Sequence, residues 1–303
     1  MLEKAELLEK AGLFRTLPRD PVHVIGASGR SGAALCRALM ARGQTIIPVV
    51  RDASRWRATG IAVVPRIADL RDASALATAL ADARAVVSAA HARHAERIIA
   101  AAPPRARLVL LGSTRKFTRW PDAHGSGVLA GEKALLASGR DGVMLHPTMI
   151  YGAQGENNVR RLVTWLRRLP VVPLPGGGWA LVQPINQSDV TRAVLASLDR
   201  EWHGPHSLVI AGPEALAYRE FIGAIARAYG LSPRRILAVP ARLLIPIAAL
   251  TRLLPGLPSI GPAEIRRLME DKAFDIAPMR AALRFEPISL ETGLAAMAAP
   301  PPG

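Results

Sequence analysis

The sequence predicts an α/β fold, a doubly wound parallel sheet followed by a smaller C-terminal mixed α/β lobe. In residues 22–39 a β-branched run, Val22–Ile25, leads through three closely spaced glycines into a helical pattern rich in alanine and leucine. Short apolar runs then keep alternating with helical patterns, which is typical of parallel strands joined by crossover helices. A chain of 303 residues, half of them apolar, suffices for one or two domains with full cores. The later runs predict strands at Thr45–Val50, Ile61–Val64, Ala85–Ala89, Leu108–Leu111 and Gly142–Leu145.

The glycine-rich turn GASGRSG, Gly26–Gly32, is the first candidate binding element. Gly26 permits a tight turn out of the strand, Gly29 lets backbone N–H groups approach a diphosphate, and Gly32 lets the helix pack close to the sheet. The helix N-terminus adds N–H donors and the positive end of a dipole. We therefore expect a Rossmann-type dinucleotide site whose residues in this turn are Gly26, Ser28, Gly29, Arg30, Ser31 and Gly32. The alternative is a turn that merely joins a strand to a helix.

The end of the second predicted strand bears on which dinucleotide is bound. An acidic residue there accepts a hydrogen bond from the ribose 2′-hydroxyl of NAD, whereas an arginine pairs with the 2′-phosphate of NADP. Arg51 comes first, Asp52 follows it, and Arg55 and Arg30 are nearby in sequence. This order favours NADP(H) over NAD(H), while Asp52 keeps NAD(H) open.

Other candidate cofactor residues follow predicted strands, because ligands of open parallel sheets lie outside the carboxyl ends of the strands. For His91 the alternative is a surface residue at the start of a helix. These candidates are Asp69, Leu70, Ala89, Ala90, His91 and Pro147.

Composition limits the class of protein and its partners. The single cysteine, Cys36, excludes an internal disulfide and a cysteine-rich metal site, and we predict no metal site. A net charge of +15 favours anionic partners, but the arginines are scattered, so nucleic acid is not the expected partner. With no signal peptide and no apolar run of about 20 residues, we expect a cytoplasmic protein.

The domain organisation is predicted as follows. Residues 1–20 form an amphipathic helical extension, and residues 21–158, with about 179–200, form the dinucleotide-binding domain. The smaller substrate or partner lobe comprises 159–178 and 201–303. It should open with a basic amphipathic helix at Val159–Leu169 and a Pro/Gly-rich loop at Pro170–Gly178.

The apolar stretch Ala241–Leu254 is too short, and carries a proline too centrally, to span a membrane. We expect it to be buried in the smaller lobe. Its flanking arginines leave a second interpretation, in which it lies on a membrane surface or against a protein partner and the protein is peripheral to the membrane.

The sequence resembles the extended or atypical short-chain dehydrogenase/reductase superfamily, specifically its NAD-dependent epimerase/dehydratase-like members. The resemblance begins near Pro21 and covers nearly all of the remaining chain. Within the superfamily we place the chain near the accessory NAD(P)-binding subunit of respiratory complex I. The motifs that carry the resemblance are GASGRSG, ADLRD at Ala68–Asp72, LLGST at Leu110–Thr114, GEKALLASG at Gly131–Gly139, HPTMIYG at His146–Gly152 and VQPINQSDV at Val182–Val190.

The resemblance also implies the catalytic groups. The family uses a tyrosine four residues before a lysine on one helical face, with a serine or threonine that holds the substrate oxygen. Lys133 matches the lysine that binds the nicotinamide ribose, and Ser113 or Thr114 matches the hydroxyl, but Leu129 occupies the tyrosine position. A leucine transfers no proton, so another acid would be required. The candidates for it are Tyr151, His124, Lys116 and His91.

Three functions are compatible with the sequence. The first is an NADP(H)-dependent oxidoreductase acting on an unidentified small molecule through a different acid. The second is a catalytically inactive NAD(P)-binding sensor or assembly subunit that holds a protein partner. The third is a nucleotide-sugar-type epimerase or dehydratase, which would also need the missing proton shuttle.

Overall fold

The chain divides into two compact units. The computed structural model describes residues 20–152, 158–232, 234–250 and 261–299, with the backbone alone at 247–250. Unit 1 comprises Met1–Leu111, Gly131–Met144 and Thr191–Ser207, and unit 2 comprises Gly112–Ala130, Leu145–Val190 and Leu208–Gly303. The predicted N-terminal helix at 1–20 lies outside the described residues, apart from Asp20.

A seven-stranded sheet has the order β11-β6-β5-β4-β1-β2-β3. Central strand β1 pairs in parallel with both β2 and β4, so the strand order reverses beside β1. Such a reversal opens a crevice at the carboxyl ends of the strands. The predicted doubly wound α/β fold is therefore confirmed. The seven strands are β1 (Val22–Ile25), β2 (Ile46–Val50), β3 (Arg66–Ile67), β4 (Ala85–Ser88), β5 (Arg107–Leu111), β6 (Gly142–Pro147) and β11 (Pro205–Ile210).

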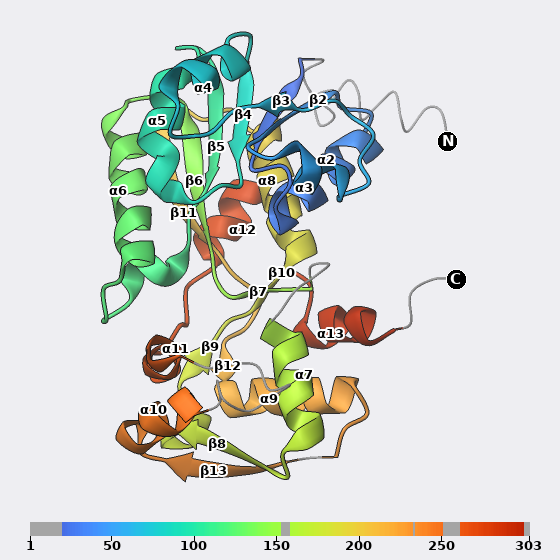
Figure 1. Cartoon of the computed structure of the whole chain (residues 1–303), viewed down its shortest axis with the longest axis vertical. Coiled ribbons are helices and arrows are strands. Elements are labelled where there is room, and N and C mark those ends of the chain that lie inside the picture. The colour runs from blue at the N-terminus through green and yellow to red at the C-terminus, as the bar shows by residue number, and fades with distance from the viewer. Residues whose placement is uncertain (1–19, 153–157, 233, 251–260, 300–303) are drawn as a thin grey trace. The chain divides into compact units, whose positions relative to one another are not determined.

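Helices and short 3-10 turns connect these strands. Figure 1 shows α4 and α5 on one side of the sheet and α2 on the other. The connecting elements are α2 (Arg30–Ala41), α3 (Ala53–Arg57), α4 (Ala73–Leu80), η1 (Ala92–His94), α5 (Ala95–Ala101), η2 (Thr114–Phe117), α6 (Ala123–Ala137) and α8 (Gln187–Asp199).

The position of β1 and β4 in the core of unit 1 explains why both strands are largely apolar. Every residue of both strands is buried, as expected of central strands covered on both faces. Leu35 and Leu39 on α2 and Leu76 and Leu80 on α4 supply buried side chains from the helices. The apolar stripe of each helix thus covers the sheet.

The third predicted strand, Ile61–Val64, is wrong. Strand β3 lies at Arg66–Ile67, and residues 61–64 form an extended loop. The buried indole of Trp56 donates a hydrogen bond to Val63 O at 2.7 Å, and the Val64 side chain is 88% exposed. The Val63 carbonyl is thus directed to the indole of its own segment rather than to a neighbouring strand.

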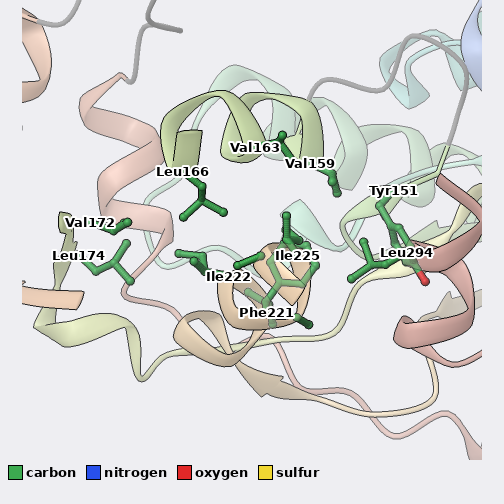
Figure 2. Packing of buried hydrophobic residues seen from close by; sticks show 13 residues of the cluster. Tyr151, Val159, Val163, Leu166, Val172, Leu174, Phe221, Ile222, Ile225 and Leu294 are labelled. Atoms are coloured by element: carbon green, nitrogen blue, oxygen red, sulfur yellow. The ribbon is translucent and has the colours of Figure 1, made fainter. Parts of the chain in front are cut away.

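Unit 2 has its own hydrophobic core, shown in Figure 2. Buried side chains of α7 face those of α9 there, with Leu294 of α13 and Tyr151 of β7 at one end. The helices of this unit are α7 (Asn158–Arg168), α9 (Tyr218–Ala228), α10 (Ala241–Leu250), α11 (Pro262–Arg267), α12 (Ala277–Leu283) and α13 (Leu290–Ala298).

Three two-stranded sheets complete unit 2. They pair β10 (Ile185–Asn186) with β7 (Ile150–Tyr151), β12 (Leu216–Ala217) with β9 (Leu181–Val182), and β13 (Arg235–Val239) with β8 (Val171–Pro175). The predicted Pro/Gly-rich loop at Pro170–Gly178 is therefore wrong over its first half. Strand β8 runs parallel to β13 there, and only Gly176–Gly178 form a turn, η3. Both prolines of β8 are tolerated because it is an edge strand.

The apolar stretch predicted at Ala241–Leu254 is helix α10 as far as Leu250, and the remainder lies outside the described residues. Its Leu244 is buried against Ile265, whereas Leu243 is 53% exposed. No helix in the described part of the chain has the length and apolar character needed to cross a bilayer.

Candidate functional site

The glycine turn after β1 is built as its sequence requires. Gly26 has φ +73°, and a Cβ there would lie 3.0 Å from Ala90 N and 3.1 Å from Ala89 C. A Cβ on Gly32 would lie 2.3 Å from Gly26 O, so only glycine lets α2 start this close to the turn. Gly29 is the N-cap residue of α2 and is exposed. The turn therefore presents uncovered backbone at the N-terminus of α2.

A pocket of about 490 Å³ lies in unit 1 at the carboxyl ends of β1, β2 and β4. We call it the arginine-lined pocket, because five arginines contribute to its wall. Arg71 pairs with Asp69, whereas the other four side chains donate no hydrogen bond to any described residue. The pocket is thus strongly basic at the switch point of the sheet. Its arginines are Arg51, Arg55, Arg71, Arg93 and Arg97.

The two carboxylates of the pocket are already engaged. Asp52 is the N-cap residue of α3, and its Oδ1 accepts hydrogen bonds from the backbone N and the hydroxyl of Ser54 at 2.8 and 2.6 Å. These hydrogen bonds lower the pKa of Asp52. Asp69 accepts from Arg71 N and Nη2, and this pairing holds the pKa of Asp69 well below its ordinary value. Five arginines against two carboxylates still leave the pocket with an excess of positive charge.

The predicted cofactor residues other than His91 fall into three groups. Six line the arginine-lined pocket: Gly26, Ser28, Arg51, Asp69, Leu70 and Ala90. Ala89 touches the glycine turn instead, and Gly29, Arg30, Ser31 and Gly32 form the cap and first turn of α2. Lys133 and Pro147 line neither this pocket nor the cavity of unit 2 described below.

His91 takes the role of the alternative interpretation, a residue at the start of a helix. Its Nδ1 accepts a hydrogen bond from Arg93 N at 3.0 Å and so caps η1. Sequence reasoning missed three residues of the wall that follow it: Arg93, His94 and Arg97. Their position just after the end of β4 was the available signal. Burial and the nearby arginines lower the pKa of His94.

A second cavity, of about 390 Å³, lies within unit 2. We call it the aromatic cavity because Phe117, Trp165, Tyr218 and Phe274 line it. Two of the predicted catalytic residues, Ser113 and Thr114, line it as well.

Ser113 and Thr114 differ in how their hydroxyls are engaged. Thr114 is buried, and its hydroxyl donates to Pro147 O at 3.2 Å. The Ser113 hydroxyl accepts from Arg115 N at 3.2 Å, which leaves its proton available for a substrate oxygen. Ser113 is therefore the better placed of the two hydroxyls.

The remaining predicted catalytic groups are not gathered at this cavity. Leu129 and Lys133 both lie on α6, and both side chains are exposed. Tyr151 is 1% exposed in the core of unit 2, and burial raises its pKa to about 12. A phenol so placed is a poor proton donor to a bound substrate, and Tyr151 lines neither pocket.

One family model matches the part of the chain that holds the glycine turn. Residues 26–163 match the model of the family described as NAD(P)H-binding. The matched residues contain the glycine turn and every wall residue of the arginine-lined pocket except Ile25. No curated protein sequence matches the chain.

Solved structures share the fold of the chain. An NADPH-dependent quinone oxidoreductase from Escherichia coli, complexed with NADPH, has a TM-score of 0.71 at 17% identity over 91% of this chain and 99% of its own. A short-chain dehydrogenase/reductase superfamily protein from Agrobacterium tumefaciens with bound NAD has a TM-score of 0.67 at 15% identity, covering 92% and 96%. UDP-glucuronic acid 4-epimerase from Bacillus cereus, in complex with UDP-glucuronic acid and NAD, has a TM-score of 0.68 at 16% identity, covering 91% and 97%.

The predicted resemblance to the short-chain dehydrogenase/reductase superfamily is confirmed at the level of fold. The placement near the complex I subunit stays a prediction. The residues present fit an NAD(P)(H) cofactor, because the glycine turn forms a cradle that a Cβ would fill and the adjacent pocket is lined by arginines.

Proposed function

We propose that the protein is an NADP(H)-dependent oxidoreductase of the short-chain dehydrogenase/reductase type that works without the usual catalytic tyrosine. The observation that carries this proposal is the arginine-lined pocket beside the glycine turn. The NADPH-bound quinone oxidoreductase among the structural neighbours shows that this fold supports such chemistry elsewhere.

The preference for NADP(H) follows from the charges at the end of β2. Arg51 and Arg55 both line the pocket without a side-chain hydrogen bond to any described residue, so a 2′-phosphate would supply their partner. Asp52, the residue that would accept from the ribose of NAD, already caps α3. Its engaged Oδ1 makes it a weaker hydrogen-bond acceptor for a ribose.

The chain's own residues have distinct expected roles in the reaction. When bound, NADP(H) supplies or accepts the hydride. Lys133 holds the nicotinamide ribose, as the resemblance implies, and the Ser113 hydroxyl donates a hydrogen bond to the substrate oxygen. The aromatic cavity takes the organic part of the substrate.

A second candidate is an NAD(P)-binding protein without turnover, which acts as a sensor or an assembly subunit. The observation in its favour is Leu129, which puts a half-exposed aliphatic side chain at the position of the family's proton donor. The same absence weighs against an epimerase or dehydratase, because both need a proton shuttle.

Titration of the purified protein with NADPH and NADH tests the cofactor assignment. We expect NADPH to bind at least about tenfold more tightly, and Arg51→Ala to remove most of that difference through loss of a charge-assisted hydrogen bond. Arg57→Ala is the matched control, since Arg57 lies on α3, is exposed and does not line the pocket. Equal affinity for both nucleotides in the wild type would overturn the NADP(H) preference.

Turnover assays then separate the candidates. NADPH oxidation is followed with carbonyl compounds, quinones and UDP-glucuronic acid as acceptors. An oxidoreductase oxidises NADPH with at least one acceptor and loses most of its kcat in Ser113→Ala. Tight NADPH binding without oxidation by any acceptor would favour the non-catalytic candidate.

A further inference from the structure

The aromatic cavity of unit 2 combines flat apolar walls with a cluster of cations. Aromatic residues make up only 4% of the chain, yet four of them line this one cavity. Phe117 and Phe274 contact each other with ring centroids 5.5 Å apart. Arg115, Arg267 and Lys272 line the same cavity. A ligand that fits both features has an aromatic body and a negative charge.

Arg267 on α11 is a partly buried cation of the cavity wall with few partners. Its side chain is only 24% exposed, and it donates no hydrogen bond to any described residue. Within the described part of the chain its one ion-pair contact is long, at 3.9 Å from Asp122 Oδ2. A guanidinium carries five N–H donors, so this half-buried group lacks most of the acceptors that it normally has.

Lys272 adds a second charge that is only loosely balanced. Its Nζ donates to Arg267 O at 2.6 Å and lies 3.9 Å from Glu270 Oε2. Burial lowers the pKa of Lys272 and the pKa of Arg267, and nearby Arg115 lowers both further. The cavity therefore has an excess of positive potential in a partly dry environment.

The carboxylates beside the cavity are held by other donors. Asp122 accepts from Arg115 Nε and Gly125 N, each at 2.8 Å. Glu270 is 5% exposed and accepts from the Thr118 hydroxyl at 2.8 Å and from Arg119 N at 2.5 Å.

The other two carboxylates of the cavity wall, Glu264 and Asp271, are also hydrogen-bonded. Glu264 accepts from Arg161 Nη1 at 3.1 Å and from Gly261 N at 2.8 Å, and Asp271 accepts from Leu181 N at 2.9 Å. Among the other cations of the wall, Arg115 and Arg161 are paired with carboxylates and Arg119 is exposed. Arg267 and Lys272 are therefore the partly buried cations best placed to receive an external anion.

We propose that the aromatic cavity binds an aromatic carboxylate, whose carboxylate pairs with Arg267 beside Lys272 and whose ring packs among Phe117, Trp165 and Phe274. The two-oxygen edge of a carboxylate matches the fork of a guanidinium. A neutral aromatic compound of the same size can pack against the aromatic side chains, but it offers no negative charge to Arg267 and Lys272. That this anion is the substrate rests on the proposed function, whereas its binding does not.

Calorimetric titration of the full chain with benzoate and with benzyl alcohol tests the proposal. We expect benzoate to bind at least about tenfold more tightly than the neutral alcohol, because a charge-assisted bond to a half-buried guanidinium is lost with the alcohol. Arg267→Met should weaken benzoate binding by a similar factor. Arg266→Met is the matched control, because Arg266 is the exposed neighbour on α11 and does not line the cavity. Phenyl phosphate as a third ligand shows whether a carboxylate or any aromatic anion is preferred.

Several results would overturn the proposal. They are equal affinities for benzoate and benzyl alcohol, unchanged benzoate binding in Arg267→Met, or no benzoate binding by folded protein. Because Arg267 donates no hydrogen bond to described residues, Arg267→Met should melt no earlier than the wild type. If that variant does not fold, Lys272→Met carries the same test. Benzoate binding without NADPH oxidation would leave this inference standing while the proposed function fails.

Discussion

Gly32 occupies a position where any larger side chain would collide with backbone. A Cβ added to Gly32 would lie 2.3 Å from Gly26 O, whereas a Cβ added to Gly29 would lie 3.2 Å from the same oxygen. Backbone atoms cannot swing away as the end of a long side chain can. Gly32 is therefore needed for the close packing of α2 against the turn, whereas Gly29 keeps the surface of the turn open.

This difference predicts different outcomes for two single substitutions. Gly32→Ala should destabilise the protein by about 1–3 kcal/mol, the usual cost of overpacking, and should weaken NADPH binding as well. Gly29→Ala should leave the melting temperature nearly unchanged but weaken NADPH binding, because Gly29 is exposed and a methyl group would stand over the N-terminus of α2.

Calorimetric melting and NADPH titration of both variants check this. A Gly32→Ala protein as stable as the wild type would show that the turn relaxes, and would remove the packing argument.

Asp52 and His91 of unit 1 show how a local capping contact can engage a residue that the sequence offers to a ligand. The sequence makes Asp52 a rival acceptor for the ribose, but in the structure it caps α3. His91, one of the candidate acids, caps η1. Both side chains found donors within their own segment, which the backbone conformation after each strand decides.

At the scale of elements, a contact of buried His23 with Asp82, whose side chain is exposed, links β1 and β3 to the residues just after α4. His23 on β1 is 1% exposed, and its Nε2 lies 3.1 Å from Asp82 Oδ1. Arg66 on β3 donates to the same carboxylate, with Nη2 2.9 Å from Asp82 Oδ2. Burial lowers the pKa of His23 despite the neighbouring carboxylate.

This lowered pKa predicts loss of stability in mild acid. The unfolded chain binds a proton near the ordinary histidine value of about 6.5, whereas the folded protein binds it only at lower pH. The contribution is fully present above that value, and stability falls below it, by at most about 1.4 kcal/mol per pH unit, until the folded protein also takes up the proton.

Urea unfolding at pH 7.5, 6.5 and 5.5 measures the slope. It should flatten in His23→Asn and persist in His203→Asn, because His203 is exposed. A wild type equally stable at all three pH values would contradict the expected loss of stability in acid.

Two elements were mispredicted for reasons that lie outside their own segments. Ile61–Val64 has the composition of a strand, but the Trp56 indole occupies a carbonyl that a ladder would need. Residues 171–175 carry two prolines, which usually indicate a loop, yet they pair with β13 from more than 50 residues away. The local sequence pattern of residues 171–175 carries no information about a partner strand so far away in the chain.

For the molecule as a whole, the single thiol reports the integrity of unit 1. Cys36 on α2 is fully buried, and burial raises its pKa to about 12. The thiolate is the reactive form, so the native protein should resist thiol reagents.

We expect a disulfide reagent such as dithiobis(nitrobenzoate) to modify native protein at least about a thousandfold more slowly than guanidinium-unfolded protein, since modification needs a large opening of the core. Bound NADPH should slow it further. Rapid modification of one thiol per chain in the native protein would show that α2 opens locally.

The sequence by itself determined the doubly wound sheet and the glycine turn, and it pointed to a basic dinucleotide site at Arg51. Each of these follows from short-range pattern: apolar runs, missing side chains at Gly26 and Gly32, and a charge just after a strand. It also exposed the absent tyrosine at Leu129. None of this required knowing which segments meet.

Only the tertiary structure decided the composition of the aromatic cavity. Its wall joins Ser113 and Phe117 to Trp165 and to Arg267 and Lys272, which are up to about 160 residues apart in the chain. Taken one at a time, Arg267 and Lys272 would be expected to be solvated surface charges, and Phe117 and Trp165 to be core residues. Folding alone brings a poorly paired guanidinium beside aromatic rings, because segments of unit 2 that are distant in the chain meet at this cavity.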